Sequence, residues 1–138
     1  MKDYVDNNLS QDNVIILGDL NDVITDPPQD NVFLDFINSE NYYFADTDIA
    51  YGPSPDWSYP SWPSHIDHII ISDELFSVLE DATVFTFKID EHLNGGWSEY
   101  ENFISDHRPI AISFHFDTFG DINEDGGINI LDIVLLVD

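Results

Sequence analysis

Four short apolar segments of strand length are the feature that most constrains how this chain folds. They span residues 13–17, 66–71, 83–89 and 110–116. The first is a continuous apolar run closed by Gly18 and Asp19, which is typical of a strand that is buried on both faces and ends on a carboxylate. The last two alternate apolar with more polar residues, as a strand with one wetter face does. The last third of the main domain is therefore expected to be rich in strands.

One helix and one long loop are expected between these strands. A helix of about three turns is predicted after two prolines, on an apolar stripe formed by Val32, Phe33, Phe36 and Ile37. Segment 51–64 holds four prolines among four large aromatic residues, so it is expected to form an ordered surface loop. Ser72 is expected to cap a short turn that contains Leu75 and Phe76. Strand followed by helix indicates the α/β class.

The charge of the chain is strongly one-sided. Its 138 residues include 28 Asp and Glu against 3 Lys and Arg, which gives a formal net charge of −25. Because affinity for polyphosphate comes largely from Lys and Arg, this composition argues against a generic nucleic-acid or anionic-membrane surface. At 43% hydrophobic and 14% aromatic, the chain is nevertheless apolar enough to fold. We expect one domain with an appended segment.

Two further features of the sequence limit the possibilities. No run approaches the roughly 18 apolar residues that cross a bilayer, so no membrane span is expected, and the first residues resemble neither a signal peptide nor a transit peptide. No cysteine is present, which excludes disulfides, thiol catalysis and cysteine-based metal sites.

Three short blocks each place a carboxylate at the edge of an expected strand. They are Gly18-Asp19-Leu20-Asn21, Ser64-His65-Ile66-Asp67-His68-Ile69 and Ser105-Asp106-His107-Arg108-Pro109-Ile110. Carboxylate oxygens are ligands for a hard divalent cation, and a histidine tuned by a carboxylate supplies acid–base chemistry or binds phosphate. Together the blocks provide the parts that a metal-assisted phosphoester hydrolase needs.

These blocks, in this order and spacing, resemble the C-terminal half of the endonuclease/exonuclease/phosphatase superfamily, which includes deoxyribonucleases, inositol-phosphate phosphatases and sphingomyelinases. The resemblance implies part of a two-sheet α/β sandwich with helices outside. It implies that Asp19 positions or deprotonates the attacking water and that Asn21 hydrogen-bonds the scissile phosphate. It also implies that Asp67 holds the catalytic imidazole of His107, which contacts the phosphate or transfers a proton. Asp106 is implied as a ligand of the catalytic Mg²⁺ or Mn²⁺.

The earlier blocks of that superfamily have no room before Asp19. They are an asparagine, a metal-binding glutamate and an active-site histidine or tyrosine. The expectation is therefore that residues 1–117 are the C-terminal part of such a domain, a fragment of a longer secreted enzyme that is inactive or nearly so alone.

Each of these residues also has a plainer interpretation. Asp19 and Asn21 could form only a polar turn after a strand. Asp67 is different, because an unpaired carboxylate in an apolar strand is costly, and His107 is the expected partner. Arg108 is interpreted as an ion-pair partner without a catalytic role. The other histidines are interpreted as surface or structural residues: His65, His68, His92 and His115.

The aromatic residues of loop 51–64 come just before Asp67 in the chain. They could line a substrate cleft, because aromatic side chains stack on bases or cover lipid and sugar faces. The alternative, which we favour, is that rings such as Trp62 pack against the edge of the sheet as part of the core.

A calcium-loop pattern begins after a change in composition at 118–120. Residues 121–132 fit the twelve-residue template, with oxygen donors at its ligand positions and glycine at the sixth. The expected calcium ligands are Asp121, Asn123, Asp125, Gly127 through its carbonyl, Asn129 and Asp132. A linker rich in Asn, Asp and Gly is the alternative, although a linker needs no donors in register.

The same stretch resembles a partial dockerin repeat, a calcium loop followed by one helix. The resemblance implies that residues 118–138 form a partial dockerin-like calcium-binding module. It implies bound Ca²⁺, a cohesin-like or cell-surface partner, and a secreted or extracellular location, with the signal peptide outside this chain.

The sequence thus predicts a metal-dependent hydrolase of phosphoester bonds, either a nuclease or a phosphodiesterase or phosphatase. Its substrate is a phosphoester, with nucleic acid among the candidates. The alternative is a non-catalytic, calcium-dependent anchoring or binding module on a degenerate hydrolase scaffold.

Overall fold

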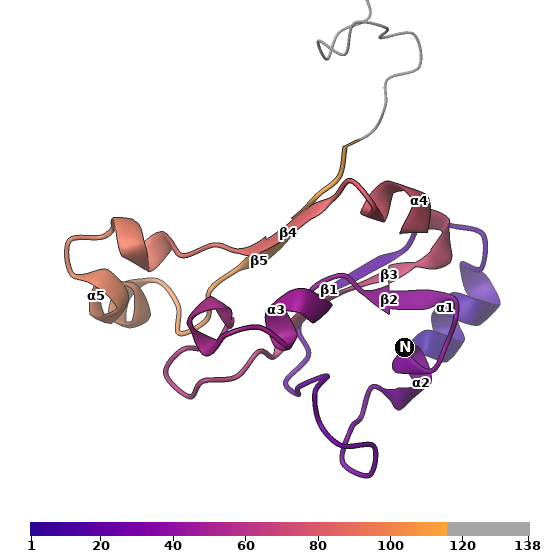
Figure 1. Ribbon diagram of the computed structural model, residues 1–138, viewed down its shortest axis with the longest axis horizontal. Coiled ribbons are helices and arrows are strands. Elements are labelled where there is room, and N and C mark those ends of the chain that lie inside the picture. The colour runs from indigo at the N-terminus through magenta and orange to yellow at the C-terminus, as the bar shows by residue number, and fades with distance from the viewer. Residues whose placement is uncertain (116–138) are drawn as a thin grey trace, which may run out of the picture.

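The structure is a computed structural model that describes residues 1–115 of the chain. The predicted module at 118–138, with all its calcium ligands, lies outside the described residues and stays a prediction. Within residues 1–115 the chain forms a mixed α/β fold with two small antiparallel sheets (Figure 1), which confirms the predicted α/β class at this level.

The larger sheet has the strand order β1-β3-β2 and is antiparallel throughout. Its strands are β1 at Ile15–Asp19, β2 at Tyr42–Phe44 and β3 at Asp67–Ser72. The central strand β3 is almost wholly buried, whereas alternate residues of the edge strand β1 are exposed. The prediction that the first strand is buried on both faces is wrong. Ile15 and Leu17 are 40% and 65% exposed, because the cluster that covers Ile69 and Ile71 on the same face of the sheet does not extend over β1.

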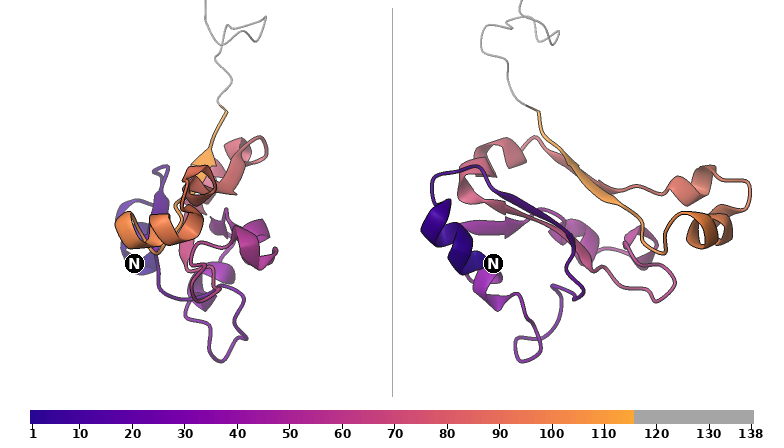
Figure 2. Two further views of the ribbon diagram at one scale, coloured as in Figure 1. Left: turned by 90° about the vertical axis from the view of Figure 1, so that its left-hand side faces the viewer. Right: turned by 180° about the vertical axis from the view of Figure 1, so that it is seen from behind.

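The smaller sheet pairs β4, Thr83–Thr86, with β5, Ile110–Ser113. Both strands lie within the predicted segments and confirm them, although each is shorter. The two sheets share a hydrophobic cluster in which Ile69 and Ile71 of β3 pack with Ile110 and Ile112 of β5. β4 and β5 extend beyond the larger sheet and lead to α5, Gly96–Phe103, at the far end of the molecule (Figures 1 and 2).

Short helices connect the strands. The α-helices besides α5 are α1 at Lys2–Asn8, α2 at Leu34–Ile37, α3 at Thr47–Ala50 and α4 at Phe76–Leu79. The 3₁₀ helices are η1 at Ser54–Asp56, η2 at Asp73–Leu75 and η3 at Ile89–His92. No helix among residues 1–115 has both the length and the apolar character needed to cross a membrane, as the sequence predicted.

Two local predictions are corrected. α2 is one turn and not about three, because Val32 and Ile37 are exposed and the expected apolar stripe is therefore not buried on one face. Ser72 lies at the N-cap position of η2, as predicted, but its side chain makes no capping hydrogen bond there. Its hydroxyl instead accepts the N–H of Val14 at 3.1 Å and donates to the carbonyl of Asp12 at 3.3 Å, which fastens the segment before β1 to the end of β3.

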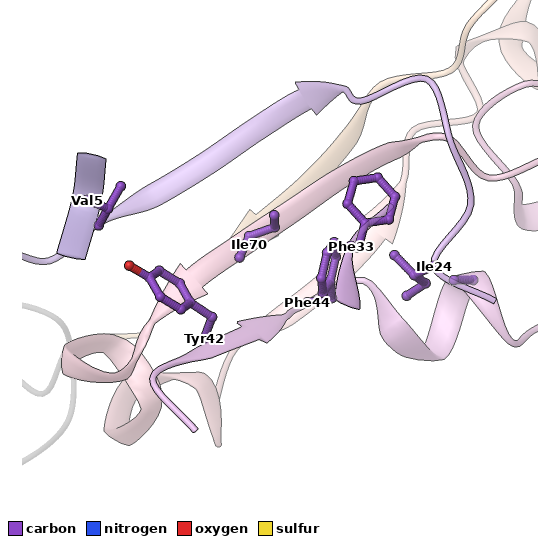
Figure 3. Packing of buried hydrophobic residues seen from close by; sticks show 7 residues of the cluster. Val5, Ile24, Phe33, Tyr42, Phe44 and Ile70 are labelled. Atoms are coloured by element: carbon purple, nitrogen blue, oxygen red, sulfur yellow. The ribbon is translucent and has the colours of Figure 1, made fainter. Parts of the chain in front are cut away.

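One hydrophobic core lies between the larger sheet and the helices α1 and α2. Val5 of α1, Tyr42 and Phe44 of β2, and Ile70 of β3 pack there with Phe33 (Figure 3). The Phe33 and Phe44 rings meet edge to face, with centroids 5.4 Å apart. The Tyr42 hydroxyl donates to Asp6 at 2.7 Å, which ties α1 to β2. Burial, and then this hydrogen bond to Asp6, raise the pKa of Tyr42.

Replacing the buried Ile71 is expected to destabilise the fold far more than replacing a residue on the exposed face of β1. Ile71 is fully buried in the cluster shared by the two sheets. Ile71→Ala should therefore lower the free energy of unfolding by about 2–5 kcal/mol. Leu17→Ala, the control on an exposed position, should change it by less than about 1 kcal/mol. Urea unfolding of the 138-residue chain measures both, and equal effects would contradict this packing.

Candidate functional site

Two carboxylates meet at one end of the larger sheet. Asp19 ends β1 and Asp67 begins β3, and the two residues are direct partners in the antiparallel register. The apolar runs of both strands fix this register, because a slip of one residue would turn their buried side chains outward. Carboxylates in opposite positions repel each other unless a proton or a cation lies nearby. This end of the sheet is therefore an electrostatic site for a positive charge.

His107 lies beside Asp67. Its Nδ1 is 2.7 Å from Asp67 Oδ2, and both side chains are partly buried. An ionised carboxylate only accepts hydrogen bonds, so Nδ1 carries the proton, and acid–base chemistry is directed to Nε2. Tyr59 stacks on the imidazole with ring centroids 4.7 Å apart, and the Tyr100 hydroxyl donates to the His107 carbonyl at 3.1 Å. The contact with Asp67 and the stacking of Tyr59 thus orient the ring, and the bond from Tyr100 holds the backbone of His107.

Asn21 closes a tight turn directly after β1. Its backbone lies in the left-handed region, with φ at 61°, which asparagine tolerates better than most residues. Its N–H donates to Asp19 Oδ1 at 2.9 Å, so the turn also orients the exposed carboxylate of Asp19. The plainer interpretation, a polar turn, therefore describes this segment correctly, and the same turn places Asp19 beside Asp67.

The donor atoms at this end of the sheet suit a hard cation. One ligand atom from each of Asp19, Asp67 and His107 lies within 4.8 Å of the others. Because Asp67 Oδ2 and His107 Nδ1 bond to each other, the remaining donors are chiefly carboxylate oxygens, which Mg²⁺ and Mn²⁺ prefer, with waters completing the shell. Asp106 is exposed and is not in this group of three, although it directly precedes His107.

Arg108 anchors the segment that carries His107. Its Nε and Nη2 donate to both oxygens of the buried Asp90, at 2.9 and 2.6 Å, and its Nη1 donates to the Pro55 carbonyl at 2.8 Å. Its backbone N–H donates to the Ser58 carbonyl at 2.7 Å. The prediction that Arg108 is an ion-pair partner is confirmed. Asp90 was not predicted, because nothing in the sequence pattern relates it to Arg108.

Loop 51–64 is ordered as predicted and contains η1 and a bridge between Tyr59 and Ser64. Trp62 is 76% exposed, so the interpretation that its ring belongs to the core is wrong. The reason is that Trp62 lies within the tight connection between the bridged residues. Ser61 next to it bonds to Glu101 and accepts the Trp97 indole N–H at 3.2 Å, which fixes the loop against α5.

A second polar cluster lies inside the protein around Asp46. This carboxylate accepts hydrogen bonds from His65 Nε2 at 3.0 Å, from His68 Nδ1 at 2.6 Å and from the Ile69 N–H at 2.7 Å. The three side chains are essentially inaccessible to solvent. His65 and His68 are thus structural, within the interpretation made from the sequence. Asp46 was missed, although His68 within an apolar strand was the available signal, since a buried imidazole needs a polar partner.

Comparisons of the chain with models of protein families, with curated proteins and with solved structures find no match. The function proposed below therefore rests on the motifs of the sequence and on the geometry of residues 1–115.

The Asp46 carboxylate should make the stability of the fold depend on acidic pH. Burial by itself raises the pKa of Asp46, but hydrogen bonds from His65 and His68 and the positive charge of His68 lower it to about 2, from an ordinary 3.8. A lowered pKa means that the stabilisation is complete above about pH 4 and is lost as the pH falls towards 2. The contribution is about 2 kcal/mol.

The comparison of Asp46→Asn with the wild-type chain tests this. The difference in unfolding free energy between the two should shrink by about 2 kcal/mol between pH 5 and pH 2. Asp48→Asn, a change at an exposed neighbour, should show no such trend. A pH-independent difference for Asp46→Asn would contradict the assigned ionisation.

Proposed function

We propose that this chain belongs to a metal-dependent hydrolase of phosphoester bonds. The observation that carries the proposal is the contact between Asp67 and His107 at 2.7 Å, with Asp19 opposite Asp67 in the sheet. An imidazole with a fixed tautomer beside two carboxylates combines an acid–base group with a cation site. The resemblance of the three sequence blocks to the endonuclease/exonuclease/phosphatase superfamily supports the same chemistry.

The proposed roles follow from donors and acceptors. Asp67 keeps the proton on His107 Nδ1, so that Nε2 is the atom that contacts a phosphate oxygen or passes a proton. Asp19 orients the attacking water and accepts its proton, and the Asn21 side chain donates to the phosphate. Asp19 and Asp67 would hold Mg²⁺ or Mn²⁺, with Asp106 as a further ligand. When bound, the cation supplies polarisation of the phosphate and stabilises its charge.

The proposal includes a larger architecture, in which residues 1–117 form the C-terminal part of a two-sheet sandwich. The earlier part would contribute the asparagine and the metal-binding glutamate of such a site. Two features support this. β1 is an edge strand of the described sheet, and its outward side chains Ile15 and Leu17 are exposed. Edge strands with exposed apolar residues are places where further strands pair and pack.

The proposed substrate is a phosphoester that can bind beside a strongly acidic protein surface. Trp62 is exposed in the same loop as Tyr59, which stacks on His107, so the loop that contacts the site also presents an aromatic ring to solvent. Such a face stacks on a base or covers a lipid or a sugar. The net charge of −25 argues against duplex DNA unless the N-terminal part of the domain is basic.

A calcium-dependent anchoring module is the second candidate function, and the donor pattern at 121–132 favours it. In the leading proposal this module is an accessory of the hydrolase. It would bind Ca²⁺, locate the enzyme outside the cell and engage a cohesin-like or cell-surface partner. In the alternative, anchoring is the whole function and the hydrolase scaffold is degenerate.

Hydrolysis of a chromogenic phosphodiester tests the leading proposal. The assay compares the 138-residue chain with the same chain extended by its upstream coding sequence, in Mg²⁺ and in EDTA. The extended chain should turn over the substrate only with the metal, and the 138-residue chain should be inactive or nearly so. In the extended chain, Asp67→Asn and His107→Gln should each lower kcat by about 10²–10⁴-fold. His115→Gln changes a histidine of the smaller sheet region and should leave kcat unchanged.

The outcomes separate the two candidates. Metal-dependent turnover that survives both Asp67→Asn and His107→Gln would contradict the assigned site. A folded extended chain without any turnover would favour the anchoring module. Activity of the 138-residue chain by itself would support the hydrolase and overturn the proposal that an earlier part of the domain is needed.

A further inference from the structure

The hydrogen bonds of the Asp46 cluster assign different protonation to its two histidines. His65 Nδ1 accepts the backbone N–H of Ser58 at 3.3 Å, while its Nε2 donates to Asp46. His65 is therefore neutral, with its proton on Nε2. His68 Nδ1 donates to Asp46, and its Nε2 faces the carbonyl of Asp22 at 3.0 Å. Both partners of His68 are acceptors, so the geometry places each of its two ring nitrogens to donate.

The His65 side of the cluster leads to the Asp67–His107 pair through Ser58. Ser58 is fully buried, and its Oγ accepts the N–H groups of Ile66 at 3.3 Å and Asp67 at 3.2 Å. Its carbonyl accepts the Arg108 N–H at 2.7 Å, one residue after His107. Ser58 therefore contacts both segments of the chain that carry Asp67 and His107. The hydrogen bond from its own N–H to His65 Nδ1 holds the Ser58 backbone in place.

The His68 side of the cluster leads to the turn that carries Asp19 and Asn21. The bond from His68 Nε2 to the Asp22 carbonyl fixes the backbone directly after that turn. The imidazole itself is fixed by edge contacts with Phe33 and Phe44, each with centroids 5.5 Å away. Asp46 thus lies between two chains of hydrogen bonds. One runs through His65 and Ser58 to the Asp67–His107 pair, and the other runs through His68 to the turn that carries Asp19 and Asn21.

We propose that Asp46, His65 and His68 are positioning residues, which hold the Asp67–His107 pair and the Asp19–Asn21 turn in register through Ser58 and the Asp22 backbone. The proposal rests on the proposed function only in naming these groups catalytic. Its physical basis is that the buried carboxylate and the two buried imidazoles form a hydrogen-bonded unit in which every ring nitrogen and both carboxylate oxygens have partners. Such a fully satisfied polar network has one arrangement and resists displacement.

Hydrogen bonds link the three side chains of this cluster, in which one ligand atom from each also lies within 4.8 Å of the others. The two imidazole nitrogens lie 2.6 and 3.0 Å from the same oxygen of Asp46, which are hydrogen-bond lengths. A zinc ion would have to sit about 2.0–2.2 Å from all three atoms and would push them apart. A zinc ion would also bind His68 Nδ1, and that nitrogen could then no longer donate its hydrogen bond to Asp46.

The first measurement uses the unaltered 138-residue chain. Ring ¹⁵N chemical shifts of the five histidines, assigned with single His→Gln variants, report which nitrogens carry protons. We expect His65 protonated at Nε2 alone, His68 protonated at both nitrogens, and His107 protonated at Nδ1. A proton on His65 Nδ1, or a single proton on His68, overturns the proposal even if no variant folds.

The second measurement tests positioning. His65→Phe keeps a ring of similar size and removes both hydrogen bonds, whereas His65→Gln retains a donor and an acceptor. In His65→Phe, exchange of the His107 Nδ1 proton with water should become about tenfold faster, because the free energy of a typical hydrogen bond corresponds to about that factor. His65→Gln should restore part of the protection. His92→Gln, at an exposed position, should leave the exchange rate unchanged.

Ser58→Ala provides an independent variant, because it removes only the Oγ that accepts the Ile66 and Asp67 N–H groups. It should accelerate exchange of the His107 proton while the core amides of Ile70 and Ile71 stay protected. An unchanged His107 signal in folded His65→Phe and Ser58→Ala would overturn the proposal. Neither measurement needs turnover, so a failed hydrolysis assay with these signals as expected would reject the proposed function and leave the positioning network standing.

Discussion

The buried carboxylate of Asp46 is the interaction on which the arrangement of the candidate site depends. A charge without access to water is costly unless it is paired and hydrogen-bonded, and Asp46 is stabilised by two imidazoles and one backbone N–H. Removal of one partner would leave a buried charge uncompensated. The segments that supply the partners are therefore held at fixed distances, and these segments adjoin Asp67 and the turn after Asp19.

Strand β3 distributes these groups because its side chains alternate between two faces. Ile70 lies in the core beneath α1 and α2, whereas Ile69 and Ile71 lie in the cluster shared with the smaller sheet. By the same alternation, Asp67 lies on the side of the smaller sheet, whose strand β5 follows His107. His68 lies on the opposite side, against Phe33 and Phe44. The five residues from Asp67 to Ile71 thus contribute both to the candidate site and to the buried contacts that hold it in place.

The sequence predicts the elements that local patterns determine. The runs of β-branched residues in β3 and the alternation in β4 and β5 mark strands, and an apolar strand that contains Asp67 requires a polar partner. Several elements escaped prediction because tertiary contacts sustain them, among them α1, which buries only Val5, β2, which has three residues, and α5, which buries only Tyr100. Burial of β1 was misjudged because it depends on neighbours that a sequence pattern does not specify. The partners of Asp46 lie 19 and 22 residues away, beyond any motif.

The central claim is that Asp19 and Asp67, beside His107, form one cation site, and titration with Mn²⁺ followed by NMR tests it most directly. Mn²⁺ broadens the signals of nuclei close to it, and Ca²⁺ present throughout would occupy the loop predicted at 121–132. At low Mn²⁺ concentration the backbone signals of Asp19, Asp67 and His107 should disappear before those of Asp3 and Asp6 in the acidic helix α1. Simultaneous broadening of all acidic segments would show that Mn²⁺ follows only the overall charge, and would contradict the site.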